Sequence, residues 1–125
     1  MHIIGSINLE MFKCISNGII TDEVILTDER VEHIINRRGQ DFYDRYGKYF
    51  ADILKNPDYI FRDKPNTALV CKKFRQEEKY INVVLRLAVS TDNPNYKNSV
   101  LTAIGENEKR FRQRLRNNTP LYKKE

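Results

Sequence analysis

One stretch of the sequence places a titratable ring beside permanent cations. Residues 26–38 have the pattern of an amphipathic helix, with residues that cap helices at its start and Gly39 as a stop. At about 100° per residue, His33 and Arg37 share a face beside the apolar stripe, four residues apart, so their side chains can meet. Imidazole changes its charge near neutral pH, and guanidinium offers paired donors in a fixed plane. The pair therefore predicts a phosphate site in which His33 acts as acid or base.

The same residues also have an ordinary structural explanation. A single histidine on a helix is often a solvated surface residue. Arg37 and Arg38 also suit the negative end of a helix. The helix alone therefore leaves both interpretations open, and the rest of the chain has to decide between them.

The hydrophobic pattern around this helix indicates a fold with both helices and strands. We expect an α+β fold in a single domain, residues 1–125, with N-terminal helices packed on one face of a twisted antiparallel sheet of about four strands. The opposite, more polar face would be free to bind a ligand. The expected helices are 26–38, Asp41–Lys55 and Glu106–Arg116, and the expected strands are 2–7, Val24–Leu26, Tyr59–Arg62, Thr67–Phe74, Tyr80–Val89, Ser99–Ile104 and Leu121–Tyr122.

A charged residue interrupts the polar face of the strand expected at Tyr80–Val89. Its odd-numbered positions from Ile81 are apolar, and Arg86 lies on the other side. A charge in the middle of a strand is costly unless something pairs with it. Either a carboxylate or a ligand phosphate would serve, and the sequence does not choose between them.

Composition sets further limits. The 125 residues are 40% hydrophobic and 31% charged, with a formal net charge of +5, which fits a soluble globular protein with affinity for polyanions. No apolar run is long enough to span a bilayer, and the first residues do not resemble a signal peptide, so we expect a cytoplasmic or phage-associated protein that does not bind membranes. Cys14 and Cys71 are expected to be free thiols, and we expect no metal and no cofactor.

The order of these features resembles a known group of nucleases. A strand at Val24–Leu26 leads into the His33 helix, Asn56-Pro57-Asp58 follows, and a strand bearing Ser99 and Thr102 comes late. This order is similar to that of phage-associated nucleases grouped with barnase, EndoU, colicin-type and RelE-type ribonucleases. In that group the helix usually ends in a second histidine, where this sequence has Arg38.

The resemblance implies the site residues and their chemistry. It implies cleavage of RNA, such as tRNA or mRNA, by attack of the ribose 2′-OH on its own phosphate, which leaves a 2′,3′-cyclic phosphate and requires an acid, a base and cations but no metal. A Lys of the kind that EndoU-type enzymes use would be Lys72 or Lys73. The expected catalytic residues are His33, Arg37, Arg86 (from its position in the strand) and Thr102, and the expected substrate-binding residues are Arg38, Ser99, Lys72 and Tyr122.

Three functions remain open at this stage. The first is a metal-independent endoribonuclease of the toxin or phage-effector type. The second is a nucleic-acid-binding module without catalysis, for which Arg38 in place of the second histidine is the sign. The third is an interaction domain whose basic C-terminal segment docks on an acidic partner, such as an antitoxin or immunity protein.

Overall fold

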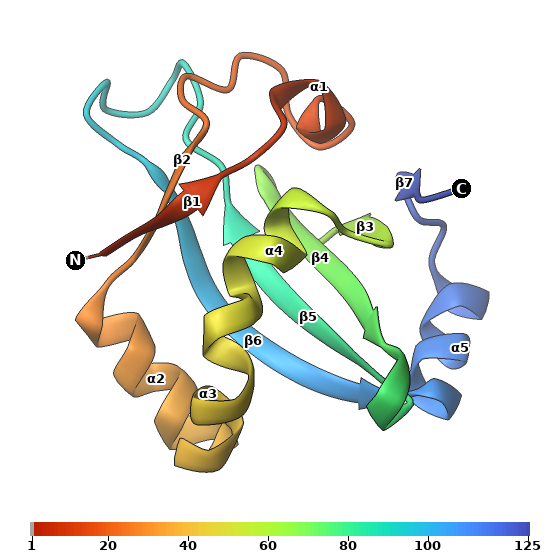
Figure 1. Ribbon diagram of the computed structural model, residues 1–125. Helices are drawn as coiled ribbons and strands as arrows, with labels where there is room; N and C mark the ends of the chain where they lie inside the picture. Colours follow the sequence, from red (N-terminus) through yellow and green to blue (C-terminus); the bar gives the residue numbers. More distant parts are fainter. Residues whose placement is uncertain (1) are drawn as a thin grey trace.

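The strands of the protein form one mixed sheet, in a computed structural model that describes residues 2–125 (Figure 1). Within these residues the sheet has seven strands in the order β1-β2-β6-β5-β4-β3-β7, so the α+β class is confirmed but the expected number of about four strands is wrong. The strands are β1 (His2–Ser6), β2 (Glu23–Leu26), β3 (Tyr59–Arg62), β4 (Thr67–Phe74), β5 (Lys79–Arg86), β6 (Asn98–Asn107) and β7 (Tyr122–Lys123).

Most neighbouring strands are antiparallel, but one pair is not. β2 runs parallel to β6, with Val24 beside Asn98 and Ile25 beside Ser99. The expectation of a purely antiparallel sheet is therefore wrong at this pair. Such a pairing needs a long crossover rather than a hairpin, and here the connection includes most of the remaining chain.

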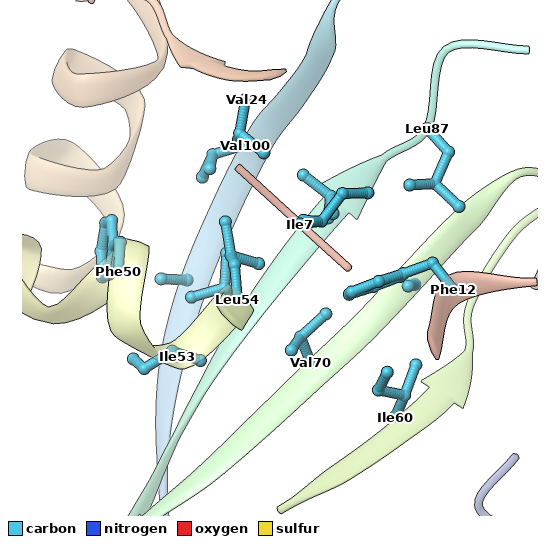
Figure 2. Packing of buried hydrophobic residues seen from close by; sticks show 14 of the residues in the cluster. Ile7, Phe12, Val24, Phe50, Ile53, Leu54, Ile60, Val70, Leu87 and Val100 are labelled. Atoms are coloured by element: carbon cyan, nitrogen blue, oxygen red, sulfur yellow. The ribbon is translucent and has the colours of Figure 1, made fainter. Parts of the chain in front are cut away.

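The apolar side chains of the strands point to a face that helices cover. The main core joins odd-numbered residues of β5 to α4, and Figure 2 shows Phe50, Ile53 and Leu54 of α4 pointing toward Val70 and Val100 of the sheet. The helices on this side or along its edge are α1 (Leu9–Phe12), α2 (Asp28–Arg38), α3 (Gln40–Tyr46) and α4 (Phe50–Lys55), with a 3₁₀ turn at Gly47–Tyr49.

The other face of the sheet is partly covered too, which corrects the expectation that it is free. Helix α5 (Glu108–Asn117) seats Phe111 in a second core with Phe61, Leu69 and Cys71. These residues come from β3 and β4, so α5 covers that half of the face. The half formed by β6 and the end of β5 is outside this second core.

Local patterns located most elements and misplaced several boundaries. β3 and β4 begin and end at the residues that the sequence predicts. The helix expected at Asp41–Lys55 is divided at Gly47, where an added Cβ would lie 2.8 Å from the ring of Tyr43. β5 ends at Arg86 rather than at Val89. β6 continues through Gly105, which pairs with Ile81, although this glycine was expected to end the strand.

Gly39 joins α2 to α3 in a backbone conformation that favours glycine. Its φ is 98° and its ψ is 154°, and an added Cβ would meet nothing within 4 Å. We expect Gly39→Ala to lower the free energy of unfolding by about 1–3 kcal/mol through backbone strain alone. Urea unfolding measures this loss, with the exposed Asn36→Ala as the control. A loss equal to that of the control would contradict the prediction.

Candidate active site

Strand β6 carries Ser99 and Thr102, and the segment from Ile25 to Arg38, which carries three further predicted residues, contacts this strand at both ends. Ile25, near the end of β2, lies beside Ser99, and Arg38, at the end of α2, donates from Nε to the carbonyl oxygen of Ala103 at 2.9 Å. The intervening chain, which includes His33, is thereby held alongside the part of β6 between these two contacts. Figure 1 shows α2 next to this strand.

Local capping and packing fix the orientation of α2. The side chain of Thr27 accepts from the backbone N–H of Arg30 at 3.2 Å, which confirms the expected cap, and Ile34 is fully buried in the main core. Counting about 100° per residue from Ile34, His33 and Arg37 lie on one flank of the helix and Arg38 lies on the other. His33 and Arg37 thus share a flank that does not include the core residue.

The two residues differ in exposure. His33 is half-buried and Arg37 is exposed, and neither makes a side-chain hydrogen bond or ion pair with residues 2–125. Both side chains are therefore available to a ligand.

Three further predicted residues lie on the face of the sheet opposite the main core. Arg86 faces Ser99 across the β5–β6 pair, and Val84 faces Thr102 two residues earlier on β5. Residues that face each other across antiparallel strands share one side of the sheet. The hydroxyl of Thr102 is buried and has no hydrogen-bond partner in the described part of the chain.

Arg86 has a protein partner. It ends β5 rather than lying in mid-strand, and its Nη2 lies 3.1 Å from Oδ1 of Asp92. Asp92 also accepts from the backbone N–H of Val89 at 2.9 Å. A carboxylate, one of the two partners that the sequence left open, thus neutralises this arginine and ties the following loop to the strand.

The same contacts predict a stability effect that depends on pH. The hydrogen bond from Val89 and the Arg86 guanidinium hold the pKa of Asp92 below its ordinary 3.8. The stabilisation is therefore complete above that ordinary value and is lost as the pH falls through the lower pKa of the folded state. We expect Asp92→Asn to lower Tm by a few degrees at pH 7 and by progressively less below about pH 4.

Thermal unfolding from pH 2.5 to 7 measures this effect, with the exposed Asp22→Asn as the control. A difference in Tm between wild type and Asp92→Asn that stays constant over the whole range would contradict the linkage.

Two predicted substrate-binding residues lie away from β6. Lys72, on β4, faces Ile81 on the side of the main core, and its Nζ donates to the carbonyl oxygen of Asn56 at 2.7 Å. Tyr122 is on β7, four strands from β6, which is about 19 Å at the usual strand spacing. The structure places Arg86, Ser99 and Thr102 on one face of the sheet and holds Arg38 against Ala103 of β6, while His33 and Arg37 lie on the flank of α2 opposite Arg38. It leaves Lys72 and Tyr122 apart from these residues.

A buried polar network escaped the sequence reasoning. Glu106, 5% exposed, accepts from Arg114 Nε and Nη2, each at 3.0 Å, and from the amide of fully buried Asn82 at 2.5 Å. The network joins β5 and β6 to α5. Asn82, a polar residue within the apolar strand β5, was the one sign of this network in the sequence. Its partners lie 24 and 32 positions further along the chain, so the sequence did not identify them.

Residues 2–125 contain neither a cluster of metal-binding side chains nor a membrane-spanning helix. No three His, Cys, Asp or Glu side chains lie together as metal ligands would. No helix there has the length and apolar character to cross a bilayer. Cys14 and Cys71 are both free thiols, as expected.

Comparison with known proteins adds one finding to this geometry. Neither a curated protein nor a solved structure matches the chain. A family model described as phage-Barnase-EndoU-ColicinE5/D-RelE like nuclease2 matches residues 4–123, which is nearly the whole chain and includes every element from α1 to α5. The chain therefore belongs to this family of nucleases.

Proposed function

We propose that the protein is a metal-independent endoribonuclease that cleaves RNA through attack of a ribose 2′-OH on the adjacent phosphate. Membership of a nuclease family supports a nucleic-acid substrate. The observation that carries the proposal is the packing of α2, which bears unpaired His33 and Arg37, next to β6, which bears Ser99 and Thr102.

The proposed roles follow from what each side chain can exchange with a phosphodiester. His33 takes the proton of the 2′-OH or gives one to the leaving 5′-oxygen. Arg37 offsets the charge that develops on the phosphate, because its guanidinium is exposed and unpaired among residues 2–125. Thr102 and Ser99 supply hydroxyls for phosphate oxygens, and Arg38, already fixed by Ala103, completes the cationic edge.

The remaining predicted residues take more distant roles in this proposal. Arg86 is bound by Asp92 and therefore shapes the β5 end beside Ser99 instead of holding the phosphate. Lys72 and Tyr122 would contact RNA only away from the scissile bond. Exposed arginines of α5 add a basic surface for RNA or for an acidic antitoxin or immunity protein, which is the partner that we propose. These arginines are Arg110, Arg112 and Arg116.

The test compares matched RNA and DNA strands in the presence of EDTA. We expect cleavage of RNA alone, products that end in a 2′,3′-cyclic phosphate, and no cleavage where a 2′-O-methyl group replaces the hydroxyl at the cut position. Cleavage of the DNA strand, or loss of all cleavage on addition of EDTA, would overturn the proposal.

A second function, RNA binding without cleavage, is favoured by the Arg38 contact. Arg38 stands where the family's helix usually carries a second histidine, and its Nε is engaged by the backbone of β6. This function predicts salt-dependent binding of RNA that stays intact. The same assay separates the two, since strand length after incubation reports cleavage and anisotropy reports binding.

A further inference from the structure

A pocket opens where β5 ends and β6 begins. Its volume is about 380 Å³, and it lies between these strand ends and the loop that joins them. Ile25, Ala88 and Tyr96 contribute to its mostly apolar lining, and Ser99 lies at its border with the candidate active site. The volume is within the range of pockets that bind small organic groups.

The charged residues at this pocket are already paired with each other. Arg86 is bound by Asp92, and Lys97 Nζ lies 2.7 Å from Oε1 of Glu23 on β2. A phosphate entering the pocket would therefore compete with two carboxylates. A neutral, flat and largely apolar group suits this lining better than an anion does.

Tyr96 supplies a surface on which such a group can stack. Its side chain is 56% exposed, and its ring contacts no other aromatic ring within residues 2–125. The backbone N–H of Tyr96 donates to the carbonyl oxygen of Asn93 at 2.9 Å, which holds this part of the loop in a turn. Exposed aromatic rings beside basic surfaces are the usual stacking platforms for bases of single-stranded nucleic acids.

We propose that this pocket binds one nucleobase of the RNA strand, stacked on Tyr96, next to the phosphodiester held along β6. The proposal rests on the proposed function, because Ser99 belongs to both the pocket and the candidate active site. Asn95 and Ser99 line the pocket and carry an amide and a hydroxyl, which are suitable donors and acceptors for the edge of a base. The pocket thereby gives the nuclease a preference for the base beside its cleavage position.

The test uses a short single-stranded RNA that carries 2′-O-methyl groups at every position, so that binding is measured without cleavage. Tyr96→Ala is expected to weaken binding by roughly 5- to 150-fold, the loss of one stacked base. Tyr96→Phe keeps the ring and is expected to bind within about twofold of wild type. Tyr49→Ala removes another partly exposed tyrosine, 42% exposed on the far side of the main core, and is expected to leave binding unchanged.

A second arm identifies the base as the bound group. In a set of strands that each lack one base, removal at a single position is expected to weaken binding to wild type as much as Tyr96→Ala does. The same removal is expected to have no further effect on Tyr96→Ala. Equal binding by wild type and Tyr96→Ala would contradict the proposal. So would a loss of binding at every abasic position that is as large in Tyr96→Ala as in wild type.

The outcomes separate this proposal from the cleavage proposal. If the protein cleaves RNA and Tyr96→Ala does not change binding, the proposal of a base-binding pocket is wrong and the proposal of RNA cleavage stands. Binding that depends on Tyr96 and on one base, without cleavage of unmodified RNA, supports the pocket and overturns the nuclease. Absence of binding to any strand overturns both.

Discussion

His33→Ala is expected to lower the rate of RNA cleavage by about 10²- to 10⁴-fold, which is the usual contribution of a positioned acid or base. The ring is half-buried on α2 and lies outside both hydrophobic cores. Its removal is therefore expected to change the free energy of unfolding by no more than about 0.5 kcal/mol. Single-turnover cleavage of a labelled RNA in EDTA measures the rate, and urea unfolding of the same sample measures stability.

The chain offers a matched control for this variant. His2 is the other histidine of the sequence, and its Nε2 lies 2.9 Å from Oδ1 of Asp28 at the exposed start of α2. His2→Ala is expected to cleave within about twofold of wild type, because this ring takes no part in the proposed chemistry. Equal rates for wild type and His33→Ala would remove His33 from the site while leaving the nuclease assignment in place.

Phe111→Ala is expected to lower the free energy of unfolding by about 3–5 kcal/mol. The ring is 1% exposed and stacks on Tyr80, with ring centroids 3.6 Å apart and planes 7° from parallel, and it also meets Phe61 edge-on. It is the buried residue of α5 in the second core, to which the Arg114–Glu106 contact adds a polar link between the helix and the sheet. Truncation leaves a cavity under α5 and removes these ring contacts.

Denaturant unfolding measures this loss, and Arg112→Ala on the exposed side of the same helix is the control. In a thermal scan the expected loss corresponds to a Tm lower by roughly 10–25 °C. A loss below 1 kcal/mol would show that α5 is not a stabilising layer of the fold, which would contradict the second core described above.

Local chemistry explains why some elements were predictable. β4 is an apolar run that lies between turn residues and a polar loop, and α2 has a capping threonine and a terminal glycine, so both were recognised from the sequence. The sequence predicted that the strand ends before Gly105, because glycine is a common strand breaker. In the structure the pairing of β6 with β5 continues through this residue. At Gly47 the sequence predicted continuity, because apolar and aromatic residues keep helical spacing on both sides of it. In the structure the α-helix is interrupted there by a 3₁₀ turn.

Contacts between distant residues were not predictable. The helix at Glu106–Arg116 was expected, but the surface that receives its Phe111 is assembled from β3 and β4 only after their register is set. Arg86 was recognised as a charge in need of a partner, yet nothing local selects Asp92 rather than a phosphate. The candidate site has the same character: residue type indicated His33 and the resemblance implied Ser99 and Thr102, while the parallel pairing of β2 with β6, which places Ile25 beside Ser99, could not be read from the sequence.

That parallel pairing also has a consequence during synthesis of the chain. Ile25 and Ser99 are 74 positions apart, and the Arg38 contact spans 65, so α2 has no docking edge until β6 has left the ribosome. Contacts of such long range form late, because the entropy of closing the loop must be overcome first. A nascent chain would thus carry His33 on an undocked segment, and the proposed ribonuclease would stay inactive beside the ribosome that makes it until β6 has been translated.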